Sequence, residues 1–209
     1  MNIIPAVLGR TVDEVLEQTR ELAGVTDVIH LDVMDGHFVP ETTPLDLGSL
    51  ISSDFTYDLH LMVIDPEQFM LVLHRNQIRR VFVHAELSEH TLHRFFELAN
   101  DVPVSAGLAL NPATSLDMIG KYRDHIDSVL LMSVTPGAAG RAFDEKVVER
   151  LHQARQIFGQ IQIFVDGGIN EQTIASIKTA DGAVAHSAIF GHPETPAERI
   201  AMLEKIAAD

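Results

Sequence analysis

Short runs of β-branched and aliphatic residues alternate with amphipathic segments along the whole 209-residue chain. The runs predict eight strands, several of them almost continuously apolar, which is typical of parallel strands covered on both faces. They lie at 2–8, 27–33, 56–62, 79–84, 102–109, 127–133, 161–165 and 182–186. The segments between them predict helices at 12–23, 45–52, 66–74, 89–99, 115–122, 143–157, 171–178 and 196–207.

Eight strand–helix units in a chain of this length favour the α/β class and a closed (β/α)8 TIM barrel. We expect one barrel domain over residues 1–209. A doubly wound open sheet is the alternative, and the count of eight strands makes it the weaker one. Two of the predicted helices begin with a capping box, a threonine followed three residues later by a glutamate: Thr11 with Glu14, and Thr195 with Glu198.

The charge and composition exclude several kinds of partner. Asp and Glu number 30 against 15 Lys and Arg, so the formal net charge is −15. Such a surface repels nucleic-acid phosphates and anionic membranes, and we expect neither as a partner. The chain has no cysteine, which excludes disulfides, thiolate metal sites and cysteine nucleophiles. Neither a membrane-spanning apolar run nor a secretory signal pattern is visible, so we expect a cytoplasmic protein.

Ligand-type side chains stand at the C-terminal ends of three predicted strands, where a barrel carries its chemistry. His30 and Asp32 are two residues apart on one strand, so their side chains point to the same face. His60 and Asp166 end two other strands. Two imidazoles and two carboxylates suit a Zn, Mn or Fe(II) ion, and the sequence does not choose among these. The alternative is that each residue caps a helix or makes a core hydrogen bond, but burying four such groups unpaired costs on the order of several kcal/mol.

Six sequence blocks surround these residues: HLDVMDGHFVP (30–40), DLHLMV (58–63), LALNPAT (108–114), LLMSVTPG (130–137), VDGGIN (165–170) and SAIF (187–190). Together and in this order they resemble the ribulose-phosphate 3-epimerase family. The resemblance implies a metal-dependent isomerase of pentose phosphate metabolism that interconverts D-ribulose 5-phosphate and D-xylulose 5-phosphate. It also implies a homo-oligomer with a small sugar phosphate as its substrate.

The resemblance further implies roles for particular residues. The metal ligands fall on His30, Asp32, His60 and Asp166, and Asp32 and Asp166 are also the acid–base pair. Methionines near the reacting carbons fall on Met34, Met62 and Met132. Phosphate contacts fall on Gly137, Ala138, Ala139, Gly140, Gly167, Gly168, His186 and Ser187. His84 and Glu86 end another strand, and we expect them to support the ligands or the fold rather than to react.

This chemistry explains why such residues are needed. Epimerisation beside a ketone removes a weakly acidic C–H proton and forms an enediolate, which a divalent cation stabilises. Inversion then requires a base on one face of the sugar and an acid on the other, roles that Asp32 and Asp166 exchange with the direction of reaction. The pair works only if one carboxyl is protonated while the other is ionised, so we expect their pKa values to be split.

Several positions depart from the family pattern, and all of them surround the substrate. They are Ala6, Glu41, the loop 136–141 with Ala139 and Arg141, and His186. The metal ligands are intact. The sequence therefore leaves two alternatives open: an epimerase for another ketose phosphate, such as allulose 6-phosphate, and a non-catalytic relative that binds a sugar phosphate. A Schiff-base aldolase is disfavoured because the four lysines fall on or at the edge of predicted outer helices.

Overall fold

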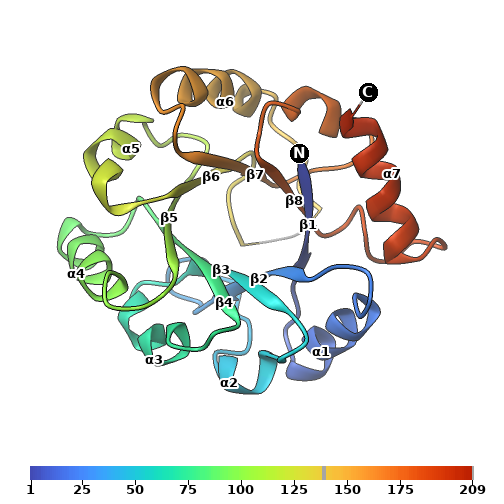
Figure 1. The fold of residues 1–209 in the computed structure, drawn as a ribbon, viewed down its shortest axis with the longest axis horizontal. Coiled ribbons are helices and arrows are strands. Elements are labelled where there is room, and N and C mark those ends of the chain that lie inside the picture. The colour runs from blue at the N-terminus through green and yellow to red at the C-terminus, as the bar shows by residue number, and fades with distance from the viewer. Residues whose placement is uncertain (138–139, 209) are drawn as a thin grey trace.

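The computed structural model describes residues 1–137 and 140–208 (Figure 1). Eight parallel strands pair in chain order, and β1 pairs with β8, with Pro5 opposite Ala185. This closure confirms the predicted barrel and shows that the open-sheet alternative is wrong. The strands are β1 Asn2–Val7, β2 Val28–Met34, β3 Thr56–Met62, β4 Ile78–His84, β5 Ser105–Leu110, β6 Ser128–Met132, β7 Gln162–Asp166 and β8 Gly182–Ala185.

The helices form a ring around the barrel (Figure 1). The α-helices are α1 Val12–Glu21, α2 Leu47–Leu50, α3 Met70–Leu73, α4 Glu89–Ala99, α5 Asp117–Tyr122, α6 Lys146–Ile157 and α7 Pro196–Ala208. Three 3-10 helices accompany them: η1 Pro66–Phe69, η2 Arg123–His125 and η3 Ile174–Ile177. Within the described ranges, no helix combines the length and the apolar character that a membrane crossing requires.

Several predicted elements are shorter in the structure, two of them for local reasons. The strand predicted at 102–109 begins at Ser105, because Pro103 has no N–H for a ladder bond and the chain turns there. The helix predicted at 171–178 is only the 3-10 turn η3. There the hydroxyl of Thr173 bonds the carbonyl of Gly168 at 3.0 Å, so side chains compete with a regular helical ladder.

Side chains fill the interior of the barrel. An inner cluster consists of Ile4, Ala6, Phe82, Ala109, Leu130, Met132, Phe164 and Val184. A Cβ added at Gly107 would lie 2.4 Å from the ring of Phe82, so this glycine makes room for the phenyl group. Towards the N-terminal ends of the strands, Asp58 accepts hydrogen bonds from Arg79 and Arg80. The C-terminal end is where the ligand-type residues gather.

Candidate metal and substrate site

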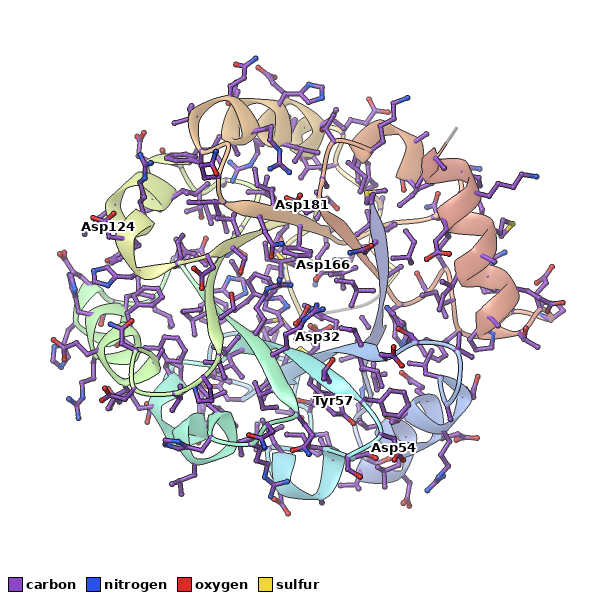
Figure 2. All side chains as sticks on the ribbon, in the orientation of Figure 1. Asp32, Asp54, Tyr57, Asp124, Asp166 and Asp181 are labelled. Carbon is purple, nitrogen blue, oxygen red and sulfur yellow. The ribbon has the colours of Figure 1, made fainter. Side chains whose placement is uncertain are left out.

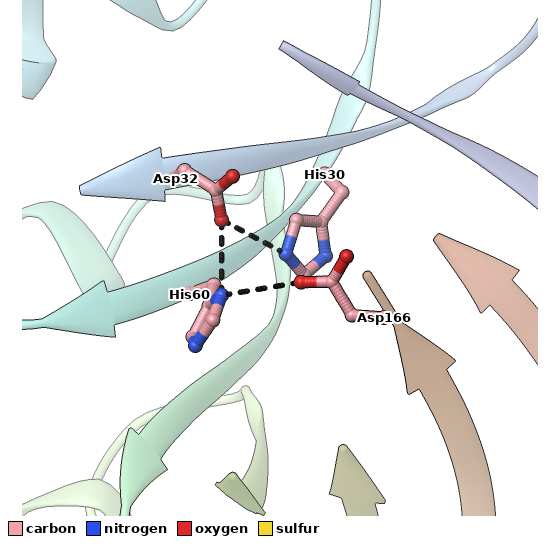
Figure 3. Close-up of side chains that lie close together, drawn as sticks. All are labelled: His30, Asp32, His60 and Asp166. Carbon is pink, nitrogen blue, oxygen red and sulfur yellow. Dashed lines mark hydrogen bonds and ion pairs between the residues drawn. The ribbon is translucent and has the colours of Figure 1, made fainter. Parts of the chain in front are cut away.

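The four predicted ligands come together near the barrel axis (Figure 3). Nε2 of His30 lies 3.4 Å from Oδ1 of Asp32, and Nδ1 of His60 lies 2.9 Å from the same oxygen. Nδ1 of His60 is 3.8 Å from Oδ2 of Asp166. One ligand atom from each residue lies within 4.8 Å of all the others. Bonds of about 2.1 Å to one ion would separate its ligands by up to about 4.2 Å, so only small side-chain adjustments are required.

Strand alternation and register produce this arrangement. On β2, His30 and Asp32 are two residues apart and both point inward. Asp32 pairs in register with His60 on the neighbouring strand β3, which places the two side chains side by side. Asp166 ends β7 and approaches from across the barrel. In Figure 2 Asp32 and Asp166 lie near the centre of the barrel, whereas Asp54 and Asp124 lie at its rim.

The cluster suits a bound divalent cation better than it suits a set of buried side chains that only hydrogen-bond to one another. The His30 ring is fully buried, and neither of its nitrogens has a hydrogen-bond partner among the residues that the structure describes. Leaving a buried polar group unsatisfied costs about 1–3 kcal/mol, so an additional partner is expected at this ring. A cation bound at Nε2 supplies one. The donor set of two imidazoles and two carboxylates, without thiolate, suits Zn, Mn or Fe(II).

The two carboxyl groups differ in their electrostatics. Burial raises the pKa of Asp32, but the neighbouring His30 and His60 rings outweigh it and hold that pKa well below its ordinary value. Burial and the negative charge of Asp32 together raise the pKa of Asp166 above its ordinary value. The expected split therefore appears: one carboxyl favours the ionised form, and its neighbour is able to hold a proton.

A pocket opens above the ligands. Three buried methionines, Met34, Met62 and Met132, bring their side chains to its wall from the ends of β2, β3 and β6. Of the substrate contacts predicted from the sequence, every described one lines this pocket, while Ala138 and Ala139 lie outside the described residues. The lining is Ala6, Leu8, Asp32, Met34, His60, Met62, Met132, Val134, Pro136, Gly137, Gly140, Arg141, Asp166, Gly167, Gly168, Ile169, Val184, Ala185, His186 and Ser187.

Residues 2–190 match the model of the "Ribulose-phosphate 3 epimerase family". The chain belongs to this family. It is 36% identical over 203 residues to the ribulose-phosphate 3-epimerase of Serratia marcescens, an alignment that covers 92% of this chain and 96% of the relative. It is 34% identical over 202 residues to the Bacillus subtilis ribulose-phosphate 3-epimerase, covering 90% and 88%. The resemblance seen in the sequence blocks is thereby confirmed.

Solved structures with little sequence similarity share the barrel of this epimerase-family chain. A 3-hexulose-6-phosphate synthase from Salmonella typhimurium superposes with a TM-score of 0.75 at 15% identity, covering 100% of this chain and 99% of that one. The KGPDC of Streptococcus mutans in complex with D-R5P gives a TM-score of 0.74 at 12% identity, covering 99% and 97%. At such identities the likeness concerns the fold alone.

The loop after β7 requires its two glycines. Gly167 has φ +103° and Gly168 has φ +61°, in the left-handed region that other residues avoid. A Cβ at Gly168 would lie 2.6 Å from the backbone nitrogen of Phe143, and one at Gly167 would lie 2.6 Å from the side chain of Val134. The glycines thus allow the loops after β6 and β7 to pass close together at the rim of the pocket.

His186 departs most clearly from the family pattern at this end of the pocket. It follows β8, and its ring contacts Phe190 with 5.4 Å between the ring centroids. Burial lowers the pKa of His186, so the ring is neutral near pH 7. Both of its nitrogens are buried without a hydrogen-bond partner among the described residues. A substrate group that reaches this ring would find a free donor and a free acceptor.

Sequence reasoning missed the residue that shapes the loop after β2. Oδ1 of Asp35 accepts hydrogen bonds from the backbone N–H groups of His37 and Phe38, each at 2.8 Å, and Oδ2 accepts one from Ile64 at 2.7 Å. Asp35 therefore ties the loops after β2 and β3 together. The Asp-Gly pair at 35–36 is a turn signal that indicates the first two bonds, but the third depends on tertiary contact.

Proposed function

We propose that this chain is a metal-dependent ketose-phosphate 3-epimerase that interconverts D-ribulose 5-phosphate and D-xylulose 5-phosphate by proton transfer through Asp32 and Asp166. The observation that carries the proposal is the convergence of two imidazoles and two carboxylates from β2, β3 and β7 at the floor of one pocket. Family membership and the epimerase relatives support the same reaction. The proposal treats residues 1–209 as one barrel domain.

The two aspartates divide the proton chemistry. Asp32, held ionised by His30 and His60, takes the proton from C3 on one face of the sugar. Asp166, whose pKa is raised, delivers a proton to the opposite face, and the roles reverse with the direction of reaction. A divalent cation held by His30, Asp32, His60 and Asp166 would supply Lewis-acid stabilisation of the negative charge on the substrate oxygens. Zn, Mn and Fe(II) are all compatible with these ligands.

The remaining lining residues orient the substrate. Met34, Met62 and Met132 are polarisable and carry no exchangeable proton, so they can surround the reacting carbons without exchanging the proton in transit. The phosphate lies at the rim of the pocket, against Gly137, Gly140, Gly167, Gly168, His186 and Ser187. The proposal also assigns phosphate contacts to Ala138 and Ala139, which lie outside the described residues. Glycines let backbone N–H groups approach an oxyanion closely, which suits an acidic protein with few lysines.

Exchange of the C3 proton with solvent tests this proposal. The enzyme is incubated with ribulose 5-phosphate in deuterated water, and deuterium at C3 is measured by mass spectrometry. We expect incorporation with the natural chain and its loss in Asp32→Asn and in Asp166→Asn. Asp124→Asn, which alters an exposed aspartate at the rim of the molecule, is the matched control and keeps full activity. Full activity in either site variant refutes the two-aspartate mechanism.

A second candidate substrate is another ketose phosphate, such as allulose 6-phosphate, and His186 is the observation that favours it. Its unpartnered nitrogens line the pocket beside Ser187 and change the polar groups available to the sugar or its phosphate. Comparing kcat/KM for the two sugar phosphates decides between them. The proposal also includes a cytoplasmic location and a homo-oligomer, both resting on family membership, and light scattering during size-exclusion chromatography tests the second.

A further inference from the structure

A chain of hydrogen bonds runs from the ligand cluster through two buried rings to the loop after β4. Nδ1 of His60 faces Asp32, while Nε2 of His60 lies 2.9 Å from Nε2 of His84. Nδ1 of His84 in turn lies 3.0 Å from Oε2 of Glu86. Both imidazoles are fully buried and stacked, with ring centroids 5.0 Å apart. Because both rings are shielded from solvent, water does not compete for the hydrogen bond between them.

The far end of this chain is fixed as a hydrogen-bond acceptor. Oε1 of Glu86 accepts from the backbone N–H of Asn111 at 2.9 Å and from the hydroxyl of Thr114. Arg150 donates to the carbonyl oxygens of both Thr114 and Asn111, which holds the loop after β5 in place. An ionised carboxylate can only accept, so the hydrogen between Glu86 and His84 belongs to Nδ1 of His84.

The hydrogen on Nδ1 of His84 determines which ring supplies the hydrogen between His84 and His60. The His84 ring is fully buried, which favours its neutral form, and its Nδ1 already holds the single hydrogen of a neutral ring, so Nε2 carries a lone pair. The 2.9 Å contact between the two Nε2 atoms needs one hydrogen, which must come from His60. His60 is then left with a lone pair on Nδ1, aimed at Asp32 and Asp166. Lone pairs facing each other across 2.9 Å call for a cation between them.

We propose that His84 and Glu86 are positioning residues that hold His60 in its Nε2–H tautomer, so that Nδ1 is available to a divalent metal ion. The inference rests on the proposed function, because it concerns the same metal site. The inference gives a role to His84 and Glu86, which contact neither the carboxylates of Asp32 and Asp166 nor the pocket. The partner of a metal-binding histidine commonly sets its tautomer in this way.

We call the hydrogen-bond chain from Glu86 through His84 to His60 the relay. The variant Glu86→Gln tests it, because the surrounding donors fix the orientation of the new side-chain amide. Its single carbonyl oxygen is needed by two donors, Asn111 and Thr114, so the NH2 group faces Nδ1 of His84. The hydrogen on His84 then moves to Nε2 and forces His60 to carry its own on Nδ1, where it competes with the metal. We expect the affinity of the metal-free full chain for Zn²⁺, measured calorimetrically, to fall about 10- to 100-fold.

Nitrogen chemical shifts of the histidine rings provide a readout that a merely structural role would not change. We expect His84 as the Nδ1–H tautomer in the natural chain and as the Nε2–H tautomer in Glu86→Gln. The matched control is Glu67→Gln, which removes a similar charge beside the exposed Arg94 and should leave Zn²⁺ affinity unchanged. A natural chain with His84 in the Nε2–H form overturns the proposal whether or not the variant folds.

A double-mutant cycle separates the relay from a general loss of charge. In a His84→Leu background, Glu86→Gln should no longer alter Zn²⁺ affinity, since its effect passes through the missing ring. An equal loss in both backgrounds overturns the relay, as does a Glu86→Gln variant with the natural affinity. If the natural chain binds no divalent metal, the proposed function fails together with the relay. If it binds Zn²⁺ and the variant binds equally well, only the relay fails.

Discussion

The buried charge cluster below the site offers a quantitative prediction for Asp58→Asn. Asp58 is fully buried on β3, and its carboxylate holds Arg79 at 2.6 Å and Arg80 at 3.0 Å. The Arg80 side chain is only 7% exposed, whereas that of Arg79 is 39% exposed. Removing the negative charge therefore leaves one cation buried without a counter-charge, while the other can turn to solvent.

The expected loss of unfolding free energy depends on the contacts that Arg80 keeps in the variant. Removing one partner of a buried ion pair costs about 3–5 kcal/mol. In the variant, Arg80 keeps its 2.7 Å hydrogen bond to Gln162 and its position 4.2 Å above the Phe164 ring, and the new amide side chain offers one oxygen. The lower limit of about 3 kcal/mol is therefore expected. For a domain of this size, it corresponds to a fall in Tm of about 6–12 °C.

Urea denaturation followed by circular dichroism measures the difference in unfolding free energy. The control is Arg79→Gln, which breaks the exposed half of the same cluster and should cost no more than about 1 kcal/mol. Two results would refute the reasoning: a loss below about 1 kcal/mol in Asp58→Asn, or an equal loss in the two variants. Either would mean that burial does not distinguish the two cations.

Three further predictions concern the pocket, the metal and a helix end. Gly168→Ala should raise KM for the sugar phosphate several-fold and destabilise the fold by about 1 kcal/mol or more, because φ is +61° and Phe143 lies 2.6 Å from the new Cβ; steady-state kinetics and a thermal melt check both. Dialysis against a chelator should abolish C3 deuterium exchange, and adding Zn²⁺, Mn²⁺ or Fe²⁺ back should restore it; unchanged exchange in metal-free protein, verified by elemental analysis, would contradict the site. Thr195→Ala should cost about 1 kcal/mol, since Thr195 caps the N–H of Glu198 at 3.3 Å; a variant that melts like the natural chain would show that this cap is not needed.

Local signals in the sequence predicted the elements well where residues close together in the chain satisfy each other's hydrogen bonds. The capping box at Thr195 and Glu198 forms in both directions, with 2.8 Å from Thr195 N to Glu198 Oε2. At Thr11 the result is partly different: Thr11 caps the N–H of Glu14, but the Glu14 carboxylate accepts from Arg10 instead of from Thr11. The helix predicted at 45–52 shrinks to α2, because the N–H of Ser52 bonds the Tyr57 hydroxyl of β3.

The sequence by itself determined the alternation of strands and helices, the two-residue spacing that points His30 and Asp32 to one face, and the residue blocks of the family. These properties depend on a few neighbouring residues, so their periodicity is readable directly. Tertiary structure alone decided which strands close the barrel, that Asp166 reaches His60 within 3.8 Å, and that His60 meets His84 ring to ring. Those outcomes depend on register and side-chain packing between strands far apart in the chain, which no local pattern encodes.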